Sequence, residues 1–473
     1  MLKNYFSMFF YKIKNFLLLT LFYKIKNFLL LTLISLNYYV IPFFLYFKLY
    51  FITYLLLRVN MRPIKNLPIS KSNIKFKVVV LSKSGGLEDI IASQKNYNKN
   101  IKYHHLSRAF FKAMFEYFIK DHASVHDYKY LNKSQFIRTG KKNYRKALIN
   151  IIKILRDNYK IDAFIGFNFC YKAERELHAA CRKLNIKFIV LHKESVFSPA
   201  EDIVVKNIYK NYTGKFEGYR IGTYSDQDRK RILGSKMSIK KQIETVGCPR
   251  IDKTFAFRKI IPKNTVVYYM IENFRGLPED YLICYHENFK KQFSFYNDKR
   301  YSNLTWSSLQ KDTVQVLIKL AKENINTQFI FKGKVGSHSK KDLPPNMPKN
   351  CKMIFGGSGE KLLKEAKLVV GWNSSVILEA MAANRFILTP SFGLKKKDLF
   401  KKKFLIDFKL DPINEGYSKK DFEKKFKYLI KKPYNKKSKN YKSKLLKHYF
   451  NNIDGSAGKK LDNFLQKNLA ESF

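Results

Sequence analysis

One stretch constrains the fold of this chain more than any other: KLVVGWNSSVILEAMAANRFILTP, from Lys367 to Pro390. Its first apolar residues, 368–370, predict a short buried strand, and Gly371 permits the sharp turn that follows. The next apolar residues recur at helical spacing, and 386–388 predict a second strand that the proline ends. A strand, a helix and a strand in this order are typical of a parallel sheet covered by helices. The stretch therefore predicts an α/β protein.

The turn before this helix carries three polar residues, Asn373, Ser374 and Ser375. Such side chains accept hydrogen bonds from the free N–H groups of a helix start, so they can act as caps. A helix N-terminus beyond the carboxyl end of a strand is also a site for phosphate, which its dipole favours. The spacing leaves both interpretations open. Glu379 lies four residues after Ser375 on the same helix face, either as a partner for ribose hydroxyls or as a solvated acid.

The alternation of strands and helices extends over most of the chain and predicts two domains of ordinary size. The first is an N-terminal Rossmann-like domain over 76–252, and the charged segment 253–264 is the predicted linker. The second Rossmann-like domain, 265–432, contains the polar turn, and basic C-terminal helices are predicted over 433–473. Two such domains facing a cleft form the GT-B arrangement, which nucleotide-sugar transferases and some epimerases use. The predicted fold class is therefore α/β and GT-B-like.

Two glycine-rich turns follow predicted strands, one in each domain. Ser84, Gly85 and Gly86 come after the first strand, in the strand–loop–helix order that can cradle a phosphate or an acceptor. This loop matches neither G-x-G-x-x-G nor the Walker sequence, so a simple tight turn is the alternative. The second turn, 356–359, precedes a short helix. Because the carboxyl ends of parallel strands share one edge of a sheet, we expect it beside the polar turn.

Transfer of a sugar from a nucleotide without a metal needs fixed positive charge or helix N-termini to hold the leaving diphosphate. Lys332 ends a strand of the second domain and supplies such a charge. The predicted donor-binding residues are Lys332, Gly357, Ser358, Asn373, Ser374, Ser375 and Glu379. Arg250, in the sequence GCPRID, is predicted to reach a phosphate in the cleft or to lie between the domains, although Asp252 offers it a local partner.

A base that takes the acceptor proton is also needed. His192 and Glu194 follow a buried strand of the first domain and are the predicted catalytic residues, since histidine titrates near neutral pH. Local hydrogen bonding of both residues is the alternative. Asp226 and Asp228 match the D-x-D of metal-dependent transferases, but Ser225 before them predicts a helix cap with acids in the first turn. No metal site and no cofactor is predicted.

The chain is strongly basic, with 91 Lys and Arg against 37 Asp and Glu and a net charge of +54. Such a charge favours nucleotide phosphates, anionic membranes or nucleic acid. The sequence has no zinc-finger spacing, arginine-rich arm or stacking-aromatic motif, so no nucleic-acid partner is predicted. The five cysteines are widely spaced and lack a C-x-x-C, so neither a disulfide framework nor a zinc site is expected.

Residues 1–60 form a hydrophobic N-terminal extension that differs from the rest of the chain. FYKIKNFLLLTL occurs twice in a row, over 10–21 and 22–33, and a run of 20 uncharged residues overlaps the second copy. About twenty apolar residues cross a hydrocarbon core of ~30 Å, so a transmembrane segment within 28–57 is predicted. Lysines on both sides leave its orientation open. The alternative is a duplicated extension, with Met61 as the true start.

Three sequences together point to a family: VGCPRID before the linker, HKES after a strand, and GWNSSVILEAMAANRFILTP. They resemble bacterial surface-carbohydrate and capsular-polysaccharide biosynthesis proteins of GT-B type, over about 76–432. They resemble more distantly the glycerophosphotransferases that build teichoic acid, which have His-Gly-Thr where this chain has His192-Lys-Glu. The resemblance implies a role in assembling lipopolysaccharide, capsule or a similar glycan, with donor binding around Asn373–Glu379 and Gly357-Ser358.

We therefore predict a glycosyltransferase-like protein of surface polysaccharide biosynthesis that uses a nucleotide-sugar donor and a glycan or lipid-linked acceptor. The alternatives are a non-hydrolysing UDP-sugar epimerase on the same fold and a non-catalytic accessory protein that binds nucleotide-sugars or glycans. The expected location is the cytoplasmic face of the inner membrane, where 28–57 anchors the chain. Lysine runs at 395–403 and 424–447 provide a further basic surface for anionic lipid.

Overall fold

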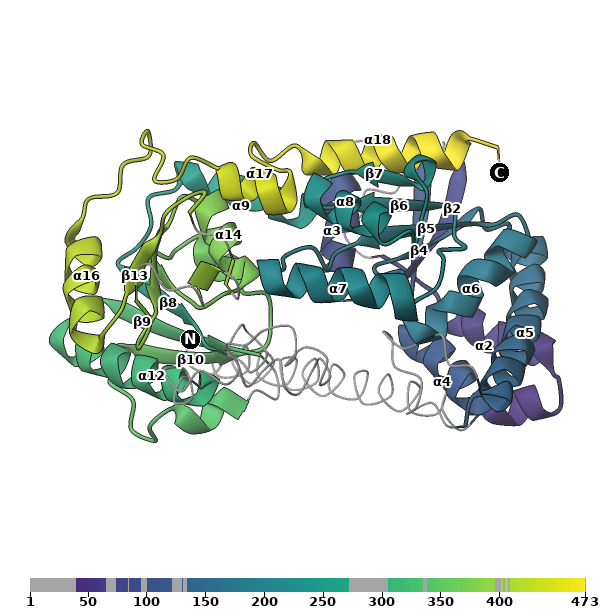
Figure 1. Cartoon of the computed structure of the whole chain (residues 1–473), viewed down its shortest axis with the longest axis horizontal. Coiled ribbons are helices and arrows are strands. Elements are labelled where there is room, and N and C mark those ends of the chain that lie inside the picture. The colour runs from purple at the N-terminus through teal and green to yellow at the C-terminus, as the bar shows by residue number, and fades with distance from the viewer. Residues whose placement is uncertain are drawn as a thin grey trace, which may run out of the picture.

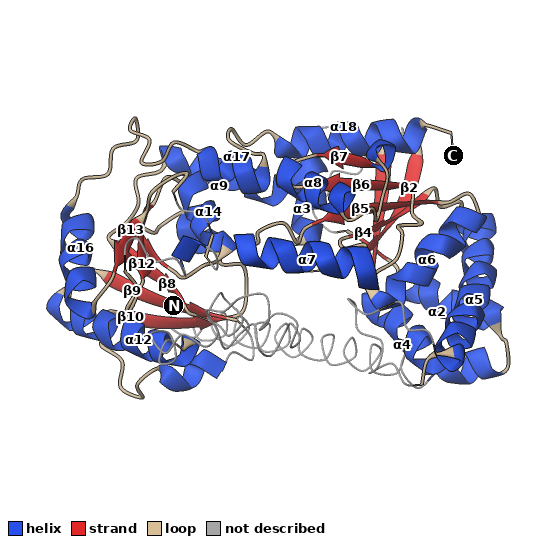
Figure 2. Cartoon of the chain, viewed as in Figure 1, coloured by secondary structure: helices blue, strands red, loops and turns tan. Residues whose placement is uncertain are grey.

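The computed structural model of the chain places two α/β domains next to each other along its longest axis (Figure 1). In each domain, helices flank a central sheet (Figure 2). The described residues are 40–64, 74–83, 85–94, 100–120, 130, 134–271, 305–334, 338–395, 401–402, 405–406 and 409–472. The predicted α/β fold of GT-B type, with two Rossmann-like domains, is confirmed.

The N-terminal domain is built on a seven-stranded sheet with the order β1-β3-β2-β4-β5-β6-β7, in which β1 is antiparallel to β3 and the other pairs are parallel. Every residue of β5 is buried, as expected for a parallel strand covered by helices on both faces. The strands are β1 (Arg62–Pro63), β2 (Phe76–Leu81), β3 (Ile101–Leu106), β4 (Ala163–Gly166), β5 (Lys187–His192), β6 (Arg220–Thr223) and β7 (Ile243–Thr245). The helices are α2 (Tyr50–Asn60), α3 (Gly86–Gln94), α4 (Arg108–Phe118), α5 (Gln135–Tyr159), α6 (Lys172–Lys183), α7 (Pro199–Tyr212) and α8 (Asp226–Gly234).

The C-terminal domain is built on a six-stranded parallel sheet with the order β10-β9-β8-β11-β12-β13. The stretch 367–390 forms β11, α14 and β12, so its predicted strand–helix–strand order is confirmed. The strands are β8 (Thr265–Tyr269), β9 (Gln328–Gly333), β10 (Cys351–Phe355), β11 (Leu368–Val370), β12 (Phe386–Pro390) and β13 (Asn414–Gly416). The helices are α12 (Trp306–Glu323), α13 (Glu360–Leu363), α14 (Ser375–Ala382) and α16 (Lys419–Lys431).

The chain passes from the first domain to the second and then returns. The outward connection is α9 (Asp252–Ala256) with a 3₁₀ turn at Phe257–Lys259, so the predicted linker is partly helical. On the return, α17 (Lys444–Phe450) contacts both α8 and α14, and α18 (Ala457–Ala470) packs on α3 and β6 of the first domain (Figure 1). The basic C-terminal helices therefore cover the N-terminal domain and join the two domains.

The order of strands brings two crevices to the interdomain side. In the first sheet β2 lies between β3 and β4, and in the second β8 lies between β9 and β11. At such points successive connections leave in opposite directions, so a crevice opens beyond the carboxyl ends of the strands, and ligands bind there. Gly85 follows β2, and Ile271 and Gly371 follow β8 and β11. The two crevices carry the glycine loop and the polar turn that the sequence singled out.

The predicted transmembrane segment within 28–57 is not supported by the described residues. Residues 40–46 are helical, the chain turns at Lys48 with a φ of +55°, and the eleven-residue helix α2 follows. No helix in the described ranges is long and apolar enough to cross a bilayer. Residues 28–39, which complete the predicted segment, lie outside the described residues.

Arg385 fastens the linker to the C-terminal domain. Its side chain is fully buried and donates hydrogen bonds to the carbonyls of Leu363 (2.8 Å), Phe257 (2.9 Å), Lys364 (3.1 Å) and Ile260 (3.2 Å). Two of these acceptors belong to the linker, and the other two are the last residue of α13 and the residue after it. One guanidinium thus satisfies four backbone groups that would otherwise be left without a donor at the domain junction.

We predict that Arg385→Met destabilises the protein by at least ~3 kcal/mol, because the carbonyls that Arg385 satisfies lose their donor in a buried place. Urea unfolding followed by circular dichroism measures the change. The matched control is Arg182→Met on α6, where the arginine is exposed; its effect should stay within about 0.5 kcal/mol. Equal stabilities of the two variants would contradict the role assigned to Arg385.

Candidate functional site

A cavity of about 310 Å³ lies between the two domains, at the carboxyl ends of both sheets. We call it the interdomain cavity. From the N-terminal domain it is lined by Gly85, Glu88, Arg250 and Ile251. From the C-terminal domain it is lined by Tyr269, Met270, Ile271, Lys332, Gly333, Lys334, Gly357, Ser358, Gly359, Glu360, Trp372, Ser374, Val376 and Glu379. Both crevices of the sheets therefore open into one space.

The three residues of the polar turn before α14 have different surroundings. Ser374 occupies the cap position of α14 but makes no side-chain cap hydrogen bond. Asn373 has a φ of +36°, and its Oδ1 accepts a hydrogen bond of 2.9 Å from the N–H of Ile406. Ser374 lines the interdomain cavity, whereas Asn373 and Ser375 line a neighbouring one. Without a side-chain cap, the α14 N-terminus keeps its positive dipole end beside Ser374.

The second glycine turn packs closely on the end of β8. A Cβ on Gly359 would lie 2.8 Å from the Tyr269 ring, and the Tyr269 hydroxyl donates to the Gly359 carbonyl at 2.6 Å. Gly357 has a φ of +70°, a conformation that glycine adopts without strain. Lys332, on the adjacent strand β9, is almost buried, and its Nζ donates to the Gly333 carbonyl at 2.8 Å. The turn and the lysine form one wall of the cavity.

Arg250 forms the opposite wall and is held by a buried network in the N-terminal domain. Its backbone N–H donates to Asp89 Oδ1 at 2.9 Å, and its NH1 group donates to the Tyr224 hydroxyl at 2.9 Å. The same hydroxyl donates to the other oxygen of Asp89. Gly85, with a φ of +80°, lets the guanidinium approach, since a Cβ there would lie 3.0 Å from it. Arg250 is therefore placed by hydrogen-bond partners from two separate segments, α3 and the loop after β6, and not by the neighbouring Asp252.

Three carboxyl groups face the same cavity as the cations Arg250, Lys332 and Lys334. Burial raises the pKa of Glu379, which Arg250 lowers in part. Glu360 forms an ion pair with Lys253, outside the cavity lining. Glu88 is exposed to solvent. Because Glu360 is paired outside the lining, three cations face the two other acids, and the cavity favours an anion.

No protein-family model matches the sequence, and no curated protein is similar to it. Similar solved structures include the UDP-GlcNAc 2-epimerase of Methanocaldococcus jannaschii in complex with UDP-GlcNAc and UDP, at 14% identity and a TM-score of 0.42, covering 83% of this chain and 99% of that one. A putative UDP-N-acetylglucosamine 2-epimerase from Listeria monocytogenes has 10% identity and a TM-score of 0.49, covering 84% and 98%. The UDP-GlcNAc 2-epimerase of Neisseria meningitidis, bound to UDP-GlcNAc, has 10% identity and a TM-score of 0.46, covering 83% and 100%.

A second cavity of about 150 Å³ adjoins the first and shares Arg250 with it. We call it the side cavity. Its lining residues are Lys193, Glu194, Ser195, Val196, Phe197, Glu201, Arg250, Asn373, Ser375 and Ile406. Glu194, one of the two predicted catalytic residues, is therefore separated from the cavity that contains Lys332 and Ser374. The side cavity lies between the loop after β5 and the turn before α14, so both domains contribute to it.

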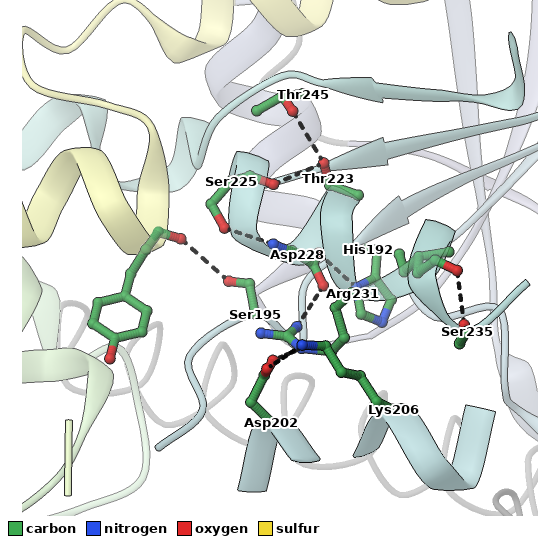
Figure 3. Close-up of polar contacts among 12 residues, drawn as sticks. His192, Ser195, Asp202, Lys206, Thr223, Ser225, Asp228, Arg231, Ser235 and Thr245 are labelled. Carbon is green, nitrogen blue, oxygen red and sulfur yellow. Dashed lines mark hydrogen bonds and ion pairs between the residues drawn. The ribbon is translucent and has the colours of Figure 1, made fainter. Parts of the chain in front are cut away.

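His192, the other predicted catalytic residue, lines neither cavity. It is fully buried, and its Nδ1 lies 2.9 Å from Asp228 Oδ2 (Figure 3). Asp228 also accepts a hydrogen bond of 2.7 Å from Arg231, and the predicted cap by Ser225 is present, since its hydroxyl accepts from the Asp228 N–H at 3.2 Å. The Phe169 ring stacks on the imidazole, with 4.6 Å between the two ring centroids. The surroundings of His192 are those of a core residue that fixes the start of α8 against β5.

The structure brings together most of the predicted donor-binding residues and adds others. The interdomain cavity includes Lys332, Gly357, Ser358, Ser374 and Glu379, together with Arg250 and Gly85. Gly86 is not in its lining, because the Phe167 ring covers it, and Ser84 lies outside the described residues. Among the described residues, no cluster of His, Cys, Asp and Glu could hold a metal ion. The charged and aromatic lining residues that sequence reasoning missed are Glu88, Lys334, Glu360, Tyr269 and Trp372.

Asp89 gives the site a measurable pH dependence. Burial raises the pKa of its carboxyl group to about 6, although Arg250 and Tyr224 act in the other direction. Between about pH 4 and pH 6 the folded protein therefore keeps a proton on Asp89 that the unfolded chain releases. As the pH rises through this window, the free energy of unfolding falls by about 3 kcal/mol. We predict that Asp89→Asn removes this contribution.

Urea unfolding of both proteins at pH 3.5 and at pH 7 measures the effect. Relative to Asp89→Asn, the wild type should be about 3 kcal/mol less stable at pH 7 than at pH 3.5. Asp157→Asn, at an exposed position, is the control. Its stability relative to the wild type should change much less between the two pH values than that of Asp89→Asn does. A difference between wild type and Asp89→Asn that does not change with pH would refute the assignment.

Proposed function

We propose that the interdomain cavity binds a nucleoside-diphosphate sugar and that the chain is an enzyme acting on the sugar part. The observation that carries the proposal is the meeting of two sheet crevices in one cavity with cations, glycine turns and an uncapped helix start. Each of these groups favours a phosphate: lysine as a point charge, glycine by allowing close backbone approach, and the helix through its N–H groups and dipole. The diphosphate would lie between Lys332, Ser374 and the 356–359 turn, with Arg250 opposite.

Epimerisation of the bound sugar is the reaction that we propose first. Inverting a carbon centre by proton exchange breaks its C–H bond on one face and forms a new one on the other. A base takes the first proton, and an acid on the opposite side of the sugar supplies the second. Glu88 comes from the N-terminal domain and Glu379 from the C-terminal domain, and both line the cavity. An exposed carboxylate suits the base, and a buried carboxyl with a raised pKa suits the acid. Such a reaction needs no acceptor and uses only groups in this cavity.

Sugar transfer is the second candidate, and the side cavity favours it. A glycan or lipid-linked acceptor needs room next to the donor and a base for its hydroxyl proton. The side cavity shares Arg250 with the interdomain cavity and carries Glu194 on its wall. Either reaction would serve the biosynthesis of a surface polysaccharide such as lipopolysaccharide or capsule.

The products of labelled nucleotide-sugars separate these proposals. For epimerisation we expect free nucleotide-sugar with an inverted carbon, exchange of its proton with deuterated water, and a rate at least ~100-fold lower in Glu88→Gln. For transfer we expect label in lipid or glycan and a similar loss in Glu194→Gln. Nucleotide-sugar that binds without either product would indicate a binding protein and overturn both reactions.

The polar turn provides a matched pair of variants for the binding site. Ser374→Ala removes a hydroxyl from the interdomain cavity, and Ser375→Ala removes one from the side cavity. We predict about tenfold weaker binding of UDP or another nucleoside diphosphate for Ser374→Ala, since a hydrogen bond to a charged group is lost. Titration calorimetry measures it, and Ser375→Ala should bind as the wild type does. The opposite order would place the diphosphate in the side cavity.

A further inference from the structure

Exposed apolar side chains are concentrated at the start of the described chain. Among the residues that the structure describes, eight of the sixteen exposed large apolar side chains lie within 43–59. These eight, which we call the N-terminal apolar face, are Phe43, Tyr46, Phe47, Leu49, Phe51, Ile52, Leu55 and Val59. Scattered exposed apolar residues are normal, whereas a contiguous patch marks a surface that binds something.

The helix α2 is apolar on both of its sides. Its inward side packs Tyr54 and Leu57 into the core of the N-terminal domain, against α5. Its outward side carries Phe51, Ile52, Leu55 and Val59, at the spacing i, i+1, i+4, i+8 of a single helical face. A helix on the surface of a water-soluble domain has polar residues in these outward positions. The outward side of α2 is therefore suited to an apolar surface.

The shape of this region fits a surface contact better than a crossing. Residues 40–46 and α2 are two short helices, and the chain turns at Lys48 between them. Eleven helical residues extend over about 16 Å, roughly half of a hydrocarbon core. The ring centroids of Phe43 and Phe47 are 5.1 Å apart, and those of Tyr46 and Phe47 are 5.0 Å apart. The three aromatic rings therefore form one continuous group. Tyrosine favours the boundary between lipid headgroups and acyl chains, and phenylalanine is common on the apolar face of helices that lie at this boundary.

Charge identifies the partner. Exposed Lys48 and Arg62 stand just before and just after α2, and the chain as a whole carries a net charge of +54. A second copy of this chain would bring two strongly basic molecules together, whereas anionic lipid headgroups neutralise both residues. The chain that leads into the face repeats FYKIKNFLLLTL, which combines lysine with leucine and phenylalanine in the same way.

We propose that the N-terminal apolar face lies in the plane of an anionic bilayer surface, with its apolar side chains below the headgroups and Lys48 and Arg62 among the phosphates. The face belongs to the end of the N-terminal domain that is farthest from the C-terminal domain (Figure 1). Membrane contact at that end leaves the interdomain cavity open to a water-soluble substrate. The proposal is independent of the reaction in that cavity.

Vesicle sedimentation with the full-length chain tests the proposal. We expect binding to vesicles of phosphatidylglycerol and phosphatidylethanolamine, and at least about tenfold weaker binding for Phe51→Gln with Leu55→Gln, since two apolar contacts are lost. The control, Ile325→Gln with Tyr428→Gln, changes two exposed apolar residues of the C-terminal domain and should bind within about twofold of the wild type. Residues 1–39 are the same in all three proteins, so a loss reports on the face itself.

A charge variant tests the lipid class. Lys48→Glu with Arg62→Glu should weaken binding to the anionic vesicles about tenfold, and 0.5 M salt should weaken wild-type binding similarly. Equal binding of the wild type to pure phosphatidylcholine would overturn the anionic partner. Unchanged vesicle binding of Phe51→Gln with Leu55→Gln would overturn the proposal. So would a wild type that binds no vesicles and forms a dimer which this variant converts to a monomer. Light scattering measures the oligomeric state.

Discussion

The cleft of this protein depends on how one cation, Arg250, is held. A guanidinium between two domains is useful only if it points to the same place in every molecule, and long side chains lose entropy when they are fixed. Here the backbone N–H of Arg250 donates a hydrogen bond to Asp89, and its guanidinium donates one to the Tyr224 hydroxyl. That hydroxyl in turn donates to Asp89. The network costs desolvation, which is visible in the raised pKa of Asp89. The network holds the Arg250 guanidinium in a position where it lines both cavities.

The fold follows from local patterns that the sequence displays, since buried parallel strands need continuous apolar runs and their crossover helices need apolar stripes. The strand β3 is harder to find, because its sequence IKYHHL contains a lysine and two histidines within an otherwise polar region. Helix α7 did leave a signal: Ser198 and Glu201 form a capping box with Pro199 at the first position. The two-domain arrangement could therefore be predicted, while individual elements with mixed composition could not.

The composition of the site was partly predictable, but its division into two cavities was not. Spacing places Asn373, Ser374 and Ser375 at one helix start, and nothing in that spacing says that Asn373 takes a positive φ and bonds to Ile406. That conformation sends adjacent side chains to different cavities. For His192, the position at the end of a strand is suitable for a base. In the structure, however, Asp228 and Phe169 enclose the imidazole ring. Such burial depends on residues distant in sequence.

Net charge and local charge have different consequences in this chain. The excess of lysine is spread over the surface, and the interdomain cavity itself contains three cations and three acids. Its preference for an anion therefore comes from arrangement, through the pairing of Glu360 with Lys253 outside the lining. Salt screens this preference less than it screens a surface field. The basic exterior acts over longer distances and is salt-sensitive, which suits contact with a lipid surface. The same composition can thus serve a specific cleft and the membrane contact that we propose for the N-terminal apolar face, without either one determining the other.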